Sequence, residues 1–167
     1  LTGLHGSELI LVAARPAMGK TAFVLNIAAH DVLKQKIPVA LFSLEMGEEQ
    51  LATRMLALES MVDSQKIRTG QLDYEELSKV MAAGDALSRS PLEIIDKAGV
   101  SVADIRSQCR SIIQKRGSLG LIIIDYLQLM SGSGRIESRQ QEVAEISRGL
   151  KGLAKELNVP VIALSQL

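Results

Sequence analysis

The segment with the clearest chemical potential covers residues 14–21 and has the sequence Ala-Arg-Pro-Ala-Met-Gly-Lys-Thr. A short apolar run at residues 9–13 precedes it, and apolar residues at helical spacing follow it. A strand, a tight loop and a helix in this order are the context that a phosphate-binding loop needs. In such a loop, the first N–H groups of the helix and the helix dipole attract an anion. Gly19 lets the backbone approach phosphate, Lys20 is placed to reach the β- and γ-phosphates, and the Thr21 hydroxyl is placed to bind Mg²⁺.

One residue of this loop departs from the general pattern, because Ala14 stands where the first glycine usually is. Alanine resists positive φ, so we expect the chain to enter the loop with ordinary backbone angles. A chance Gly-Lys-Thr beside a helix is the alternative, and the apolar strand and helix on either side argue against it. We therefore predict a nucleotide site made of consecutive residues, namely Ala14, Arg15, Pro16, Ala17, Met18, Gly19, Lys20, Thr21 and Ala22.

Other polar residues follow short apolar runs closely, as expected of side chains at the ends of buried strands. They are Glu45 after residues 39–43, Asp96 after residues 92–95, Asp125 after residues 121–124 and Gln166 after residues 159–164. In a parallel sheet the carboxyl ends of the strands share one edge, and ligands bind there. We expect Glu45, Asp125 and Gln166 to lie near the phosphate-binding loop, with Asp96 as a possible addition.

The residue types suggest a role for each of these side chains. Asp125 is placed as the acid that completes the Mg²⁺ site opposite Thr21, and the alternative is a carboxylate that caps the next turn. Glu45 can accept a proton from the water that attacks the γ-phosphate, or it can be a solvated glutamate at a helix start. Gln166 can hydrogen-bond the γ-phosphate, because an amide both donates and accepts, or it can be structural. Position alone does not decide for Glu45 or Gln166.

Apolar runs alternate with segments of helical periodicity along the whole sequence, which predicts an α/β fold with a mostly parallel central sheet and helices on both faces. The expected strands are residues 9–13, 39–43, 92–95, 121–124 and 159–164. The expected helices are residues 19–33, residues 47–62, one capped by Asp73 and Glu76 with Leu77, Val80, Met81 and Leu87 inside, one that opens with a capping box of Ser101 and Asp104 and runs to about Lys115, and one marked by Val143 to Leu157. Residues 131–135 are expected to form a flexible loop, and residues 1–167 a single domain.

Composition excludes several classes of function. The 19 basic residues balance the 19 acidic ones, so the net charge of the chain does not indicate a polyanionic partner. Aromatic residues make up 2% of the chain, too few for a surface that stacks several bases. Cys109 is the single cysteine and falls on the apolar face of an expected helix, so we expect it buried. No apolar stretch is long enough to span a bilayer, which makes the cytoplasm the expected location. Both ends look cut, and we expect a domain truncated on its C-terminal side.

Taken together, these motifs resemble the C-terminal ATPase domain of DnaB-type replicative DNA helicases, a class of RecA-like P-loop NTPases. The resemblance rests on the loop at residues 14–21, Ser-Leu-Glu-Met at residues 43–46, Ile-Asp-Tyr-Leu-Gln-Leu-Met at residues 124–130, residues 139–145, and Ala-Leu-Ser-Gln-Leu at residues 163–167. These motifs are spaced along the entire chain.

The resemblance implies an enzyme that works in a larger assembly. Family members are homo-hexameric rings that hydrolyse ATP or another NTP with Mg²⁺, move along single-stranded DNA and unwind the duplex at the replication fork, with a helicase loader and primase as partners. The resemblance makes Glu45 the catalytic base and Gln166 the γ-phosphate sensor, and it places residues 131–139 at the central channel. The family's main DNA-contacting loop and arginine finger lie beyond the last motif, so we expect slow hydrolysis by this chain alone.

Other functions stay open at this point. A recombination or repair ATPase of the RecA-like class shares the phosphate loop and the acid, although the motifs around Glu45 and Asp125 favour the helicase. A nucleotide-switched loader or scaffold module would bind nucleotide without useful turnover. A small-molecule kinase would need an acceptor pocket, for which the sequence offers no candidate.

Overall fold

The computed structural model of the chain describes residues 3–132 and 138–167. Its strands β1 (Leu9–Ala14), β2 (Val39–Ser43), β3 (Leu92–Ile95), β4 (Leu121–Asp125) and β5 (Val161–Gln166) form one sheet in the order β1-β5-β4-β2-β3. Every pair of neighbouring strands is parallel, which confirms the predicted α/β fold. Strand β4 lies at the centre, and all of its residues are buried, as a continuous apolar run implies.

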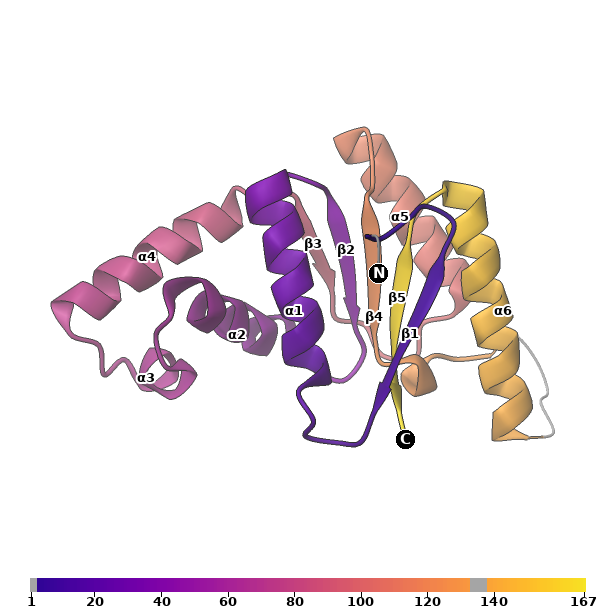
Figure 1. The fold of residues 1–167 in the computed structure, drawn as a ribbon, viewed down its shortest axis with the longest axis horizontal. Coiled ribbons are helices and arrows are strands. Elements are labelled where there is room, and N and C mark those ends of the chain that lie inside the picture. The colour runs from indigo at the N-terminus through magenta and orange to yellow at the C-terminus, as the bar shows by residue number, and fades with distance from the viewer. Residues whose placement is uncertain (1–2, 133–137) are drawn as a thin grey trace.

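Helices cover both faces of this sheet (Figure 1). Helices α1 (Lys20–His30) and α2 (Glu48–Ser60) pack on one face, and α5 (Val102–Arg116) and α6 (Arg139–Leu157) pack on the other. Because strand side chains alternate, Leu121 and Ile123 of β4 join the core beneath α1 and α2, while Ile122 and Ile124 join the core beneath α5 and α6.

Local capping signals set where two of the helices begin. Asp73 and Glu76 form a capping box at the start of α4 (Tyr74–Ser88), and Ser101 and Asp104 form another at the start of α5. Both boxes were predicted from the sequence and are confirmed. Cys109 is fully buried in α5, and burial raises the pKa of its thiol to about 12, which fits the predicted packing role.

Two of the boundaries that differ from the prediction have a clear structural description. The first helix, expected over residues 19–33, ends as an α-helix at His30 and continues as a π-helical turn, η1 (Asp31–Gln35). The last strand begins at Val161 and ends at Gln166, two residues later than predicted. Pro160 has no N–H to donate to the ladder, so pairing starts after it.

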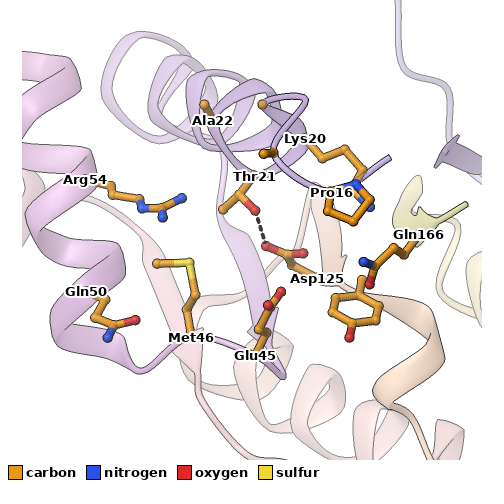
Figure 2. A pocket seen from close by; sticks show the side chains of 13 residues that line it. Pro16, Lys20, Thr21, Ala22, Glu45, Met46, Gln50, Arg54, Asp125 and Gln166 are labelled. Carbon is orange, nitrogen blue, oxygen red and sulfur yellow. Dashed lines mark hydrogen bonds between the residues drawn. The ribbon is translucent and has the colours of Figure 1, made fainter. Parts of the chain in front are cut away.

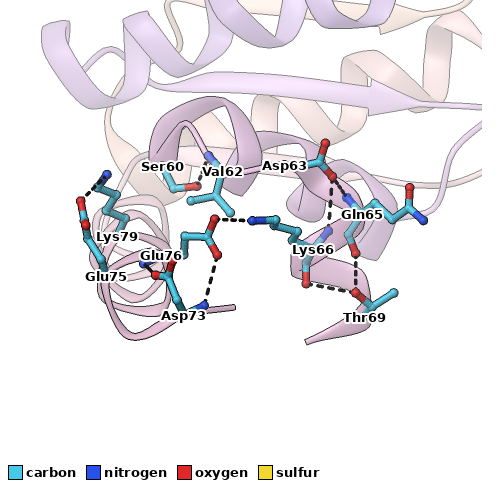
Figure 3. A network of polar contacts seen from close by, with 10 residues as sticks. All are labelled: Ser60, Val62, Asp63, Gln65, Lys66, Thr69, Asp73, Glu75, Glu76 and Lys79. Atoms are coloured by element: carbon cyan, nitrogen blue, oxygen red, sulfur yellow. Dashed lines mark hydrogen bonds and ion pairs between the residues drawn. The ribbon is translucent and has the colours of Figure 1, made fainter. Parts of the chain in front are cut away.

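The segment between β2 and β3 differs most from the expectation. It contains a short helix that was not predicted, α3 (Ser64–Thr69), capped by the Asp63 carboxylate. Lys66 of α3 donates to Glu76 of α4 at 2.7 Å, which ties the two helices together (Figure 3). Helix α4 packs on α2 and extends away from the sheet (Figure 1).

The predicted inner face of α4 is therefore only partly correct. Leu77 and Met81 are 44% and 67% exposed, and Ala83 is the buried residue of this helix. Apolar periodicity correctly predicted a helix here, but not which of its faces would be covered.

Two further expectations concern the limits of the description. The loop expected at residues 131–135, and the channel-facing segment 131–139 implied by the resemblance, fall mainly on residues 133–137, outside the described residues. Within residues 3–132 and 138–167, no helix combines the length and apolar character needed to cross a membrane.

Candidate functional site

The loop between β1 and α1 has the backbone of an anion-binding turn. Ala14 ends β1 without a positive φ, as predicted, whereas Ala17 and Gly19 have φ values of 62° and 81°. A Cβ atom on Gly19 would meet nothing within 4 Å, so the positive φ, and not crowding by the protein, requires glycine there. No side chain caps the start of α1. Its first N–H groups therefore remain available to a ligand.

A single hydrogen bond joins this loop to the end of the central strand. The hydroxyl of Thr21 donates to Oδ2 of Asp125 at 2.8 Å, and Asp125 is only 3% exposed (Figure 2). Burial raises the pKa of Asp125 above its ordinary value, and nearby Glu45 raises it further, while the Thr21 hydrogen bond, Lys20 and Arg54 lower it. Two oxygen atoms of the kind that hard cations prefer thus lie side by side.

Lys20 connects the loop to the last strand. Its Nζ donates to the backbone carbonyl of Ser165 at 2.9 Å and lies 5.8 Å from the centre of the Tyr126 ring. The ammonium group therefore sits between the ends of β4 and β5, beside the N-terminus of α1. A phosphate at that N-terminus is within the reach expected of this side chain.

These groups surround a cavity of about 390 Å³ at the carboxyl edge of the sheet. It is lined by Pro16, Ala17, Gly19, Lys20, Thr21, Ala22, Glu45, Met46, Gln50, Arg54, Asp125, Tyr126 and Gln166 (Figure 2). The cavity brings Glu45, Asp125 and Gln166 together with most of the predicted loop. Ala14, Arg15 and Met18 belong to the same loop but do not line the cavity, and Met18 is 72% exposed.

Asp96 is the candidate that lies elsewhere. Its Oδ2 accepts the backbone N–H of Glu48 at 3.0 Å, so this carboxylate satisfies an orphan donor at the start of α2. It does not line the cavity. The position after a strand was predicted correctly, but β3 lies at the edge of the sheet opposite β1, on the far side of β2 from β4.

Sequence reasoning missed four residues of the lining. Met46, Gln50 and Arg54 come from the start of α2 and the turn before it, and Tyr126 directly follows Asp125. Gln50 and Arg54 are four residues apart, so they share one exposed helix face. That spacing was the available signal, but which face of α2 meets the cavity depends on how α2 packs against α1.

Comparison with known proteins agrees with this geometry. The family model described as the DnaB-like helicase C terminal domain matches residues 1–167. "Replicative DNA helicase DnaC" of Bacillus subtilis is 54% identical over 166 residues, and "Replicative DNA helicase DnaB" of Geobacillus stearothermophilus is 54% identical over 167 residues. Each alignment covers 99% of this chain but only 36% or 37% of the relative, so the chain spans little more than a third of their length.

Solved structures show the same likeness in three dimensions. A DnaB-like replicative helicase, whose structure was described with its interactions with primase, superimposes with a TM-score of 0.92 at 39% identity, covering 99% of this chain and 40% of that one. A second solved structure, described as an ATPase domain, also superimposes with a TM-score of 0.92 at 39% sequence identity. The alignment covers 59% of its chain. With a parallel sheet of this kind and a family match over its whole length, the chain belongs to the DnaB-like helicase C-terminal domain family.

Proposed function

We propose that this chain binds a nucleoside triphosphate with Mg²⁺ and hydrolyses it, as the motor domain of a replicative helicase that unwinds duplex DNA. The observation that carries the proposal is the Thr21–Asp125 hydrogen bond at the edge of an open cavity, beside an uncapped helix N-terminus. Loop and acid are far apart in the sequence, and phosphoryl transfer requires them together.

The phosphates are proposed to bind at the start of α1. The free N–H groups there donate to phosphate oxygens, and the helix dipole adds a favourable potential. Lys20 turns from the Ser165 carbonyl toward the β- and γ-phosphates, a movement of its flexible side chain that needs no backbone change. Arg54, which is exposed and also lines the cavity, offers a second cation.

The oxygens of Thr21 and Asp125 fit a magnesium ion. Mg²⁺ at phosphate sites is held by one or two protein oxygens together with phosphate and water. Thr21 and Asp125 offer the protein oxygens of such a site. A magnesium ion held there would supply positive charge against the negative charge that develops on the phosphates during transfer. The raised pKa of Asp125 reflects a buried carboxylate that a cation stabilises in its charged form.

Glu45 and Gln166 are proposed to act on the γ-phosphate side. Glu45 is exposed to the cavity and accepts the proton of the attacking water. Gln166 donates to a γ-phosphate oxygen and so distinguishes the triphosphate from the diphosphate. Family membership further suggests a homo-hexamer on single-stranded DNA in the cytoplasm, with a loader and primase as partners.

Nucleotide titration with a fluorescent ATP analogue tests the proposal. In the presence of Mg²⁺ the native protein should bind the analogue, and Lys20→Ala and Asp125→Ala should each weaken binding by at least about tenfold, equivalent to about 1.4 kcal/mol. Lys97→Ala, at an exposed lysine outside the cavity, is the matched control and should bind normally. The proposal is contradicted if the analogue binds equally well with and without Mg²⁺, or if both site variants bind it as well as the native protein does.

Hydrolysis separates a motor from a nucleotide-switched scaffold. In the full-length protein, Glu45→Gln should bind Mg²⁺-ATP as well as the unsubstituted protein does and lose hydrolysis stimulated by single-stranded DNA. A full-length protein that binds nucleotide but shows no such stimulation is a switch, not a motor.

A further inference from the structure

The end of β5 carries site residues but has lost one of its neighbouring strands. On one side, β1 stays in register with Ser165 and Gln166. On the other side, pairing with β4 stops at Ile124 and Ala163, because the chain turns away after Asp125. The backbone groups of Gln166 on that side need another partner, since strand ends keep their order only while their N–H and C=O groups are paired.

The side chain of Gln128, in the short helix η2 (Leu127–Leu129), supplies this partner. Its Oε1 accepts the backbone N–H of Gln166 at 3.2 Å, and its Nε2 donates to the carbonyl of Gln166 at 2.8 Å. The same Nε2 donates to Oγ of Ser165 at 2.9 Å. An amide presents an acceptor beside a donor, as a strand backbone does, so Gln128 continues the ladder beyond the end of β4.

The backbone of Gln128 is held in turn by the start of α6. Its carbonyl accepts a hydrogen bond from Nη2 of Arg139, and Arg139 also pairs with Glu142. Glu142 accepts the backbone N–H of Gly132 at 3.0 Å. Leu127, next to Gln128, is buried in the core beneath α5 and α6. Gln128 is therefore fixed at its backbone by α6 and the core, and at its side chain by β5.

The strand end that Gln128 holds faces the cavity. Gln166 lines the cavity, and the Ser165 carbonyl accepts the hydrogen bond from Lys20 (Figure 2). We propose that Gln128 is a positioning residue for hydrolysis, which holds the backbone of Gln166 so that its side chain points at the γ-phosphate. This inference rests on the proposed function, and Gln128 itself does not line the cavity.

Steady-state kinetics of the full-length protein test the proposal. Gln128→Met keeps the length of the side chain and removes both polar groups. We expect kcat for ATP hydrolysis with single-stranded DNA to fall by at least about tenfold, while KM for Mg²⁺-ATP stays within about threefold, because orientation affects the transition state more than binding. Gln114→Met, at an exposed glutamine of α5, is the control and should change neither constant.

A double-variant cycle separates positioning from a general structural role. If Gln128 acts through Gln166, adding Gln128→Met to Gln166→Ala should lower kcat by less than about twofold. The proposal is overturned if the decreases in kcat of the two single variants multiply in the double variant. It is also overturned if Gln128→Met alone has the kcat of the unsubstituted protein. If Gln128→Met does not fold, Gln128→Glu keeps the length without the donors, and the same non-additivity is expected.

Amide hydrogen exchange provides a readout that does not depend on turnover. In Gln128→Met the backbone amide of Gln166 should exchange at least about tenfold faster, while those of Ile162 and Leu164 stay protected. Unchanged exchange at Gln166 overturns the proposal. A native protein that hydrolyses no ATP refutes the proposed function, while faster exchange at Gln166 would still show that Gln128 holds the strand end.

Discussion

Replacing Thr21 with valine tests whether the Thr21–Asp125 hydrogen bond organises the site. Valine has nearly the same shape and is also branched at Cβ, so the variant loses the hydroxyl and little else. The bond it removes is 2.8 Å long and ends on a carboxyl that is 3% exposed. Hydrogen bonds to charged groups contribute about 1.5–3 kcal/mol, and a chain of this size loses roughly 2–4 °C of Tm per kcal/mol. We therefore expect the Tm without nucleotide to fall by about 3–12 °C.

The opposite shift in stability is expected at the partner residue. Asp125→Asn keeps an oxygen for the Thr21 hydroxyl and removes a charge that burial disfavours. Burial raises the folded pKa of Asp125 above 3.8, so the folded state binds this proton more tightly than the unfolded state does. In the pH range between the pKa of Asp125 in the unfolded state and its pKa in the folded state, this carboxyl therefore lowers the free energy of unfolding as the pH rises. Asp125→Asn should thus raise Tm at neutral pH, and the gain should disappear on acidification.

Function should respond differently from stability. Both variants remove a ligand of the proposed magnesium site, so both should lose the Mg²⁺-dependent part of nucleotide binding. Opposite changes in Tm with the same loss of binding are hard to obtain from general damage to the fold. That combination therefore identifies the pair as a functional site maintained at a cost in stability.

Thermal melts without nucleotide, at neutral and acidic pH, measure the stability changes, and titration with fluorescent ATP measures binding. The control is Thr53→Val on α2, whose hydroxyl bonds the Glu49 carbonyl of its own helix at 2.9 Å and whose loss should cost within about 0.5 kcal/mol. The reasoning about the buried carboxylate is wrong if Thr21→Val has the same Tm as Thr53→Val. It is also wrong if the Tm of Asp125→Asn at neutral pH is lower than that of the native protein.

Three further predictions concern catalysis, phosphate binding and the core. Glu45→Gln should lower the hydrolysis rate by about 100- to 10,000-fold in a single-turnover assay, as expected when a general base is lost. Lys20→Arg keeps the charge but not the compact ammonium, and it should still weaken Mg²⁺-ATP binding in the titration, whereas Lys97→Arg should not. Ile123→Ala, at a fully buried position of β4, should cost about 2–5 kcal/mol in urea unfolding, whereas Ala at exposed Gln114 should cost little.

Much of the fold could be predicted because each strand is a short apolar run followed by a polar residue. In β4, the apolar residues leading into Asp125 require cover on both faces, and α/β architecture is the arrangement that gives it. The carboxyl ends of parallel strands then share an edge, so Thr21 and Asp125 could be expected together without knowledge of strand order.

The parts that could not be predicted depend on packing between elements. Leu77 and Met81 have the spacing of an inner helix face, but α4 packs on α2 away from the sheet and leaves them exposed. Asp96 also follows a strand, but β2 separates that strand from β4, and the Asp96 carboxylate caps α2 instead of joining the cavity. Arg54 reaches the cavity because of how α2 lies beside α1, which no local pattern encodes.

Strand order explains why one strand end affects the whole site. Strands β1 and β4 carry the phosphate loop and Asp125, but they are not neighbours, because β5 is inserted between them. At the end of β5, between these two strands, the Ser165 carbonyl accepts the hydrogen bond from Lys20 and Gln166 lines the cavity. A shift of β5 along its axis would move the Lys20 anchor and Gln166 together, whereas Thr21 lies on α1 and Asp125 on β4. Under the proposed function, the end of β5 therefore affects nucleotide binding through Lys20 and hydrolysis through Gln166, so substitutions that act on Gln166 alone should lower turnover more than affinity.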